Sequence, residues 1–173
     1  MKTKLIISSL FISSVFMPLA HAEDGQIQFK GVITADACKI DSNSQNQTVN
    51  MGTVSTQALS DVNRTAAATR FSIKLVDCPK TITHAKVKFD GPTNEVNKNL
   101  LALSNVEGAA NGVAIGIYED DNNTPIPIAT SSKLKEFKGN STELDFVAKY
   151  VATKSKVTPG IGNAVASFTI DYN

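Results

Sequence analysis

The sequence predicts an all-β protein folded as an antiparallel β-sandwich. Apolar and polar side chains alternate with a period of two, as they do in strands that bury one face. This alternation recurs in six segments: 27–33, 71–75, 85–89, 113–117, 144–150 and 164–172. We find no amphipathic helix of the length that parallel strands need as connections, so the strands are expected to be antiparallel.

Turn-forming residues separate these strands. Runs of Gly, Pro, Asn, Asp and Ser mark turns at 41–46, 90–92, 107–112, 120–127 and 159–160. One short helical turn is expected within residues 55–63. No internal repeat, linker or low-complexity block interrupts the pattern, which therefore predicts a single sandwich domain of immunoglobulin type.

The first 22 residues are predicted to be a secretory signal peptide. Lys2 and Lys4 supply a positive start, and residues 5–19 are mostly apolar. Ala20-His21-Ala22 then has the small-x-small pattern of a cleavage site. Because the apolar stretch is shorter than a bilayer span needs, we expect cleavage after Ala22 and a soluble mature protein outside the cytoplasm.

The charge balance of the mature chain argues against a nucleic-acid or anionic-lipid binder. Without its first 22 residues the chain has 151 residues, with 15 Lys and Arg against 16 Asp and Glu. The resulting net charge of −1 provides no basic surface for phosphate groups. The charged residues are scattered through polar stretches, as on an ordinary solvated surface.

Cys38 and Cys78 are the only cysteines, and both lie in the exported part of the chain. An even number of cysteines in an oxidising compartment predicts one disulfide between them. A zinc site needs three or four ligands, and His84 is the only histidine after the signal peptide, so no metal site is expected.

The sequence contains no convincing catalytic motif, and the protein is not expected to be an enzyme. A Ser-His-Asp hydrolase needs a positioned histidine, but His84 lies at the start of a predicted strand and no G-x-S-x-G motif is present. The acidic run Glu119-Asp120-Asp121 lacks the alternation and the distal glutamate of a calcium loop, so it is interpreted as a hairpin loop. No cofactor is predicted.

The two ends of the mature chain carry the main functional signal. An extended segment, residues 23–35, precedes the domain of residues 36–173, and its alternate positions share one face. That row is Gly25, Ile27, Phe29, Gly31 and Ile33. The alternation runs out with the strand 164–172, so the sandwich is expected to lack its last strand and to expose a groove. Residues 27–33 are then either an extension outside the domain or its own first strand.

Several short motifs follow one another in a characteristic order along the mature chain. They are Phe29-Lys30-Gly31 before Cys38, then 47–52, 71–78, 99–103, 112–117 and 146–150, with Gly160 fourteenth from the end and Tyr172 penultimate. In this order they resemble the type 1 fimbrial protein family, whose subunits are assembled by the chaperone–usher pathway. Each motif alone is weak, but their joint order with the signal peptide and the cysteine pair is specific.

The resemblance implies a structural pilus subunit that supports cell adhesion and polymerises head to tail by donor-strand exchange. In this family an incomplete immunoglobulin-like sandwich is completed first by a chaperone strand and then by the extension of the next subunit. The donor row here would be Gly25, Ile27, Phe29, Gly31 and Ile33. The groove edge and chaperone recognition site would be Gly160, Phe168, Ile170 and Tyr172.

The implied partners are neighbouring pilin subunits, a periplasmic chaperone and an outer-membrane usher, with no nucleic acid. The implied location is a fimbria on the bacterial cell surface, reached through the periplasm. Only four residues precede Ile27 after the signal peptide, which leaves a major or a minor subunit open. The alternative is a monomeric secreted or periplasmic β-sandwich that binds a ligand through its long polar loop at 120–140.

Overall fold

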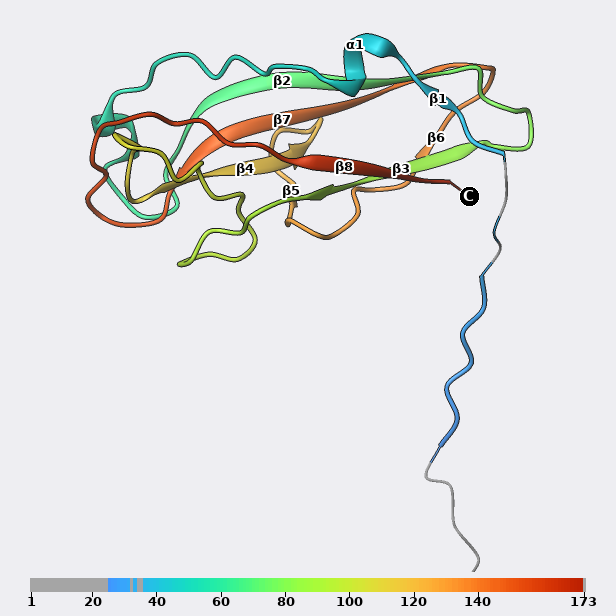
Figure 1. Cartoon of the computed structure of the whole chain (residues 1–173), viewed down its shortest axis with the longest axis horizontal. Coiled ribbons are helices and arrows are strands. Elements are labelled where there is room, and N and C mark those ends of the chain that lie inside the picture. The colour runs from blue at the N-terminus through green and yellow to red at the C-terminus, as the bar shows by residue number, and fades with distance from the viewer. Residues whose placement is uncertain (1–24, 32, 34–35, 173) are drawn as a thin grey trace, which may run out of the picture. The chain divides into compact units, whose positions relative to one another are not determined.

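The structure is a computed structural model that describes residues 25–31, 33 and 36–172 (Figure 1). The signal peptide predicted at residues 1–22 lies outside the described residues. The chain divides into two units, with the boundary after Ile33. All strands and helices of the described residues belong to the second unit.

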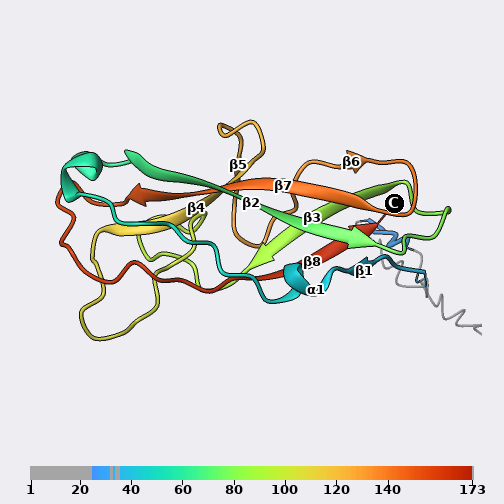
Figure 2. The same ribbon diagram turned by 90° about the horizontal axis from the view of Figure 1, so that it is seen from above.

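Two antiparallel sheets form the layers of the second unit (Figures 1 and 2). The larger sheet contains, in spatial order, β1 (Lys39–Ile40), β2 (Thr65–Val76), β7 (Thr142–Ala152), β4 (Val113–Glu119) and β5 (Pro125–Ile126). The smaller sheet contains, in spatial order, β6 (Lys135–Glu136), β3 (His84–Asp90) and β8 (Ser167–Tyr172). A short helix, α1 (Ser42–Gln45), and a single 3-10 turn, η1 (Thr56–Leu59), precede β2. No helix within the described ranges is long and apolar enough to cross a membrane.

The core lies between the sheets because each strand turns one row of side chains inward. In β3, Val87 and Phe89 are 0 % and 3 % exposed, whereas Lys88 between them is only half-buried. Phe89 meets Phe71 of β2 and Phe146 of β7, with ring centroids 5.9 and 5.0 Å away. Both contacts are edge to face, the favourable geometry for aromatic pairs.

The predicted all-β sandwich is confirmed, and five of its six strands are present. The sixth, at residues 27–33, is wrong: residues 25–31 and 33 have no regular secondary structure and belong to no sheet. The interpretation of this segment as the domain's own first strand is therefore also wrong. A strand needs a hydrogen-bonded neighbour, and alternation alone cannot supply one. The helical turn expected within 55–63 is confirmed as η1.

A disulfide joins Cys38 and Cys78, as the sequence predicted. The two cysteines are 40 residues apart in sequence, and they are only 7 % and 6 % exposed. Cys38 is followed directly by β1, which pairs with the last residues of β2, Lys39 lying opposite Val76. The disulfide therefore fixes the β1 edge of the larger sheet.

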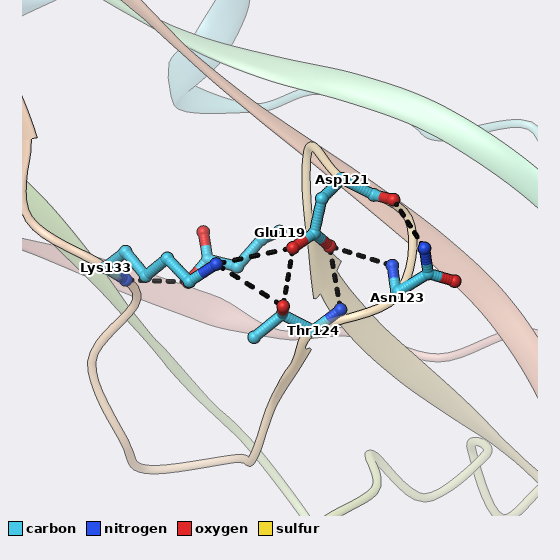
Figure 3. A network of polar contacts seen from close by, with 5 residues as sticks. All are labelled: Glu119, Asp121, Asn123, Thr124 and Lys133. Atoms are coloured by element: carbon cyan, nitrogen blue, oxygen red, sulfur yellow. Dashed lines mark hydrogen bonds and ion pairs between the residues drawn. The ribbon is translucent and has the colours of Figure 1, made fainter.

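The hairpin between β4 and β5 is closed by hydrogen bonds to Asp121 (Figure 3). Its carboxylate accepts from the backbone N–H of Asn123 at 2.8 Å and of Thr124 at 2.7 Å, and Lys133 Nζ lies 3.3 Å away. Hydrogen bonds from the hydroxyl and the backbone of Thr124 hold the pKa of Asp121 well below its usual range. Glu119 accepts from the Lys133 N–H at 2.6 Å, so both carboxylates bond within this loop region.

Replacing both cysteines by serine, Cys38→Ser with Cys78→Ser, is expected to lower the free energy of unfolding by roughly 4 kcal/mol. The physical reason is that the unfolded chain regains the freedom that the closed loop removes. Urea unfolding of both proteins under non-reducing conditions measures the difference. Equal unfolding midpoints would contradict a stabilising role of the disulfide.

The low pKa of Asp121 makes the hairpin sensitive to acid. A folded-state pKa below the unfolded value of about 4 stabilises the fold above that pH, and this stabilisation is lost as the pH falls further. We therefore expect the stability difference between wild type and Asp121→Asn to shrink below about pH 4. Urea midpoints at about pH 6 and about pH 3 test this, and a pH-independent difference would refute it.

Candidate functional site

The outer edge of β8 is the candidate functional site. β8 ends the smaller sheet, and β3 is its hydrogen-bonded neighbour. On β3 the carbonyls of Val87 and Phe89 bond away from β8, to the segment 129–132. Their partners on β8 therefore turn their own backbone groups away from β3. These partners are Ile170 and Phe168. On the side of β8 that faces away from β3, their backbone groups have no hydrogen-bond partner in the described chain.

The inward side chains of β8 are only half covered. Phe168, Ile170 and Tyr172 pack against the core but keep intermediate exposure, whereas Val87 opposite Ile170 is fully buried. Other core-packed residues share this intermediate exposure: Ile40, Met51, Phe71, Leu103, Tyr150, Ala164 and Ala166. A row of half-exposed apolar side chains therefore lies along β8, as expected of a sandwich that lacks its last strand.

The edge of the larger sheet at β1, in contrast, is capped by side chains. Gln45 donates its amide N–H to the Ile40 carbonyl at 3.2 Å, and Gln47 donates in the same way to a β2 carbonyl at 3.1 Å. The backbone N–H of Lys74 donates to Ser44 Oγ at 3.0 Å. These bonds occupy backbone groups that an added strand would need. Of these two edge strands, β1 and β8, β8 is the one whose outward backbone groups have no partner in the described chain.

Two tyrosine hydroxyls bridge the sandwich near the two ends of β8. Tyr172 donates to the Cys38 carbonyl at 3.3 Å, and Tyr150 of β7 donates to the Gly162 carbonyl at 2.9 Å. Burial raises the pKa of both hydroxyls, so they remain donors at neutral pH. A Cβ on Gly162 would lie 2.6 Å from Tyr150 Oη, so a larger residue here would push the end of the Tyr150 side chain aside. The two bonds hold both ends of the β8 segment against the sandwich.

A cavity of about 270 Å³ is lined in part by the segment that precedes β8 in the sequence, and we call it the end pocket. Its lining includes residues 52–54 on one side and 157–160 with Gly162 on the other. Gly160 packs tightly here, because a Cβ would lie 2.5 Å from the backbone N of Ala110 and from the Gly108 carbonyl oxygen. Gly160 therefore lies beside the end pocket, while the other three predicted edge residues lie on β8 itself.

The predicted donor row lies in the first unit of the chain. The side chains of Ile27, Phe29 and Ile33 are 80 %, 93 % and 102 % exposed. A Cβ added to Gly25 or Gly31 would meet nothing within 4 Å. Three large apolar side chains exposed at odd-numbered positions form a surface that is costly to keep in water.

Local contacts account for the other residues that the sequence singled out. His84 begins β3 opposite Glu136, and its Nδ1 lies 2.8 Å from the Thr83 hydroxyl. In the part of the chain that the structure describes, no group of three or more His, Cys, Asp and Glu side chains could hold a metal ion.

Sequence patterns missed the residues that shape the surroundings of the site. Tyr150 and Gly162 act through a contact between a strand and a distant loop, and no local pattern indicates it. Ser44, Gln45 and Gln47 were noted in the sequence only as turn or motif residues. Their hydrogen bonds to backbone groups at the β1 edge were not predicted.

The sequence is similar to those of bacterial fimbrial proteins. Residues 27–173 match the family described as fimbrial protein. The chain is 34 % identical over 172 residues to the probable major fimbrial subunit LpfA of Escherichia coli O157:H7, covering 99 % of this chain and 96 % of that protein. It is 34 % identical over 185 residues to the type-1 fimbrial protein A chain of Salmonella typhi, covering 99 % and 100 %.

Solved structures share the fold. The type I fimbria protein and antigen of Burkholderia pseudomallei is 35 % identical, with a TM-score of 0.62 over 78 % of this chain and 88 % of that one. The P pilus rod subunit PapA has a TM-score of 0.66 at 22 % identity, over 79 % of this chain and 99 % of that one. At this lower identity the likeness concerns the fold alone.

Gly160→Ala is expected to lower the free energy of unfolding by roughly 1–3 kcal/mol, because the new methyl group meets backbone atoms that cannot move aside. Ser155→Ala, at an exposed position in the preceding turn, is the matched control. Urea unfolding of the two variants measures the effect. Equal stabilities would contradict the close packing of Gly160.

Proposed function

The chain belongs to the fimbrial protein family, and on this basis we propose that it polymerises by donating residues 25–33 to the open edge of β8 in another copy. It is a structural subunit of a bacterial fimbria and not an enzyme. The observation that carries the proposal is the open edge, where backbone groups of β8 lack partners beside a half-covered core in the described chain.

The donated segment would run antiparallel to β8, because neighbouring strands in an immunoglobulin sandwich of this kind are antiparallel. Residues directly opposite each other then share one face of the sheet. With Gly25 opposite Tyr172, the register places Ile27 opposite Ile170, Phe29 opposite Phe168, Gly31 opposite Ala166 and Ile33 opposite Ala164. The smallest residue would thus meet the large tyrosine, and Ile33 would reach the end pocket.

Such pairing would supply hydrogen bonds to the β8 edge and remove the apolar side chains of the donated segment from water. The backbone groups of Phe168 and Ile170 would gain hydrogen bonds, and the exposed edge of the smaller sheet would be covered. The side chains of Ile27, Phe29 and Ile33 would leave water, and each burial is worth roughly 1.5–3 kcal/mol. The groove would in turn receive the apolar surface that its half-covered core residues lack.

Repetition of this pairing would produce a fibre. The donor segment and the acceptor edge are different surfaces, so the contact is head to tail and does not close on itself. A chain of such contacts grows as an open filament, which fits a fimbria at the bacterial surface. Backbone pairing and apolar burial together would make each joint long-lived.

Before polymerisation the open edge would need a temporary strand. We assign this role to a periplasmic chaperone, by the strand-addition mode for which chaperone–pilin pairs are a standard example. Phe168, Ile170 and Tyr172 would then be its contact row. An outer-membrane usher would exchange the chaperone for the next subunit, and the predicted signal peptide supports this route through the periplasm.

Phe29→Asp is expected to abolish polymerisation and to leave the subunit's own fold intact, because Phe29 would fill the neighbour's groove. Gln28→Asp adds the same charge at the adjacent position on the opposite face, and it should still polymerise. Protein sheared from cells is compared on denaturing gels before and after boiling. Wild type and Gln28→Asp should give ladders that collapse on boiling, whereas Phe29→Asp should run as a monomer.

Two outcomes would overturn this assignment. If Phe29→Asp fails to fold in the presence of the chaperone, Phe29 belongs to the subunit's own core and not to a donor segment. A single monomer band from abundant, folded wild-type protein would favour the monomeric ligand-binding module.

A further inference from the structure

Two exposed apolar side chains belong to loops of which other residues, Ala110 in one and Gly160 with Gly162 in the other, line the end pocket. Val106 is 47 % and Ile161 is 45 % exposed, and both sit in loops that are bonded to each other. The Ile161 N–H donates to the Gly108 carbonyl at 2.8 Å, and the Ile161 carbonyl accepts from Ala110 at 3.0 Å. Ile161 is flanked by Gly160 and Gly162, which line the end pocket. We call Val106 and Ile161 the end patch.

The end patch and Cys38 lie at opposite ends of the sandwich. The start of β2 pairs with the end of β7, Thr65 opposite Val151, and the 152–160 loop follows directly. The end of β2 pairs with the start of β7, and Cys78 follows two residues later. Between these ends β2 runs for 12 residues. At the usual rise this is a length of about 40 Å.

The chain between the donor row and Cys38 is short. Cys38 is the fifth residue after Ile33, so the two cannot lie more than about 17 Å apart even when the chain is fully extended. In the register proposed above, Ile33 of the donor copy reaches the end pocket of the acceptor copy. The Cys38 end of the donor copy must therefore lie close to the acceptor's end patch.

We infer that the end patch is a second contact surface, covered in the fibre by the Cys38 end of the copy that donates its strand. The covering residues would be those around the disulfide, 36–39 and 77–80. This inference rests on the proposed strand exchange and adds a contact between the domains themselves. It assigns Val106 and Ile161 to the joint, although neither belongs to the groove or to the donor row.

The chemistry of the Cys38 end fits an apolar neighbour. Lys39 Nζ lies 3.0 Å from Asp77 Oδ2, and their side chains are 76 % and 62 % exposed. Because these charges are paired with each other, neither is left without a partner at the contact, and both remain at its solvated rim, where they cost no desolvation. The half-buried Pro79 and the aliphatic stem of Lys39 provide apolar area for the contact.

The size of the patch indicates what this contact does. Two half-exposed side chains are too few for a stable interface by themselves, which needs on the order of 1,000 Å². Strand exchange holds the two surfaces together, so even a small contact forms at high effective concentration. The end patch therefore slows dissociation of the joint without being needed for its formation.

The test compares the full-length double variant Val106→Asp, Ile161→Asp with the control Val96→Asp. Val96 is 60 % exposed in the 93–101 loop and is no part of the end patch. Two readouts are needed: capture of a synthetic peptide of residues 23–35 by the purified subunit, and the rate at which polymers fall apart in denaturant. We expect unchanged peptide capture and roughly tenfold faster dissociation for the double variant alone.

Equal dissociation rates for the double variant and Val96→Asp would overturn the inference. If the double variant loses peptide capture, its dissociation rate no longer tests the end patch alone. The test is then made with Asp77→Asn on the donor side, which leaves the end pocket intact and Lys39 without its ion-pair partner. Asp77→Asn should then speed dissociation relative to Asp145→Asn, a carboxylate paired with Lys135 at 3.7 Å, and equal rates would again overturn the contact. Failure of wild type to capture the peptide would instead refute strand exchange itself.

Discussion

Backbone N–H and carbonyl groups must be hydrogen-bonded wherever they are removed from water, and β8 is the strand on which this requirement is left open. β3 satisfies one side of β8, while Phe168 and Ile170 turn their backbone groups away from β3, beside half-covered apolar side chains. An edge of this kind attracts any extended chain that can reach it. The remaining features of the molecule can be understood as ways of keeping this edge available to one kind of strand.

In the larger sheet, the backbone groups at the β1 edge do have hydrogen-bond partners. Gln45, Gln47 and Ser44 bond backbone groups along its β1 edge, so that edge is protected by the chain itself. Near the ends of β8, hydrogen bonds from Tyr172 and Tyr150 hold the strand and its approach in place. The disulfide fixes the residue to which Tyr172 bonds. The β1 edge is thus protected, and the β8 edge is held in place but left open.

Donor and acceptor features are complementary although they occur in one chain. The described residues of the segment with exposed Ile27, Phe29 and Ile33 have no regular structure, and the domain covers the apolar side chains beside β8 only in part. In the proposed pairing each supplies what the other lacks. The complete folding unit would then be one domain together with the donor segment of another copy.

The sequence by itself determined the all-β class, five strands, the disulfide and membership of the fimbrial family, because alternation, cysteine count and motif order are local or compositional signals. It misjudged residues 27–33, whose alternation is that of a strand, because strand formation also depends on a neighbour. Only the tertiary structure decided which sheet edge is open, why position 160 must be glycine, and how Tyr150 meets Gly162. These features arise from contacts between segments far apart in the chain, and no local pattern encodes such contacts.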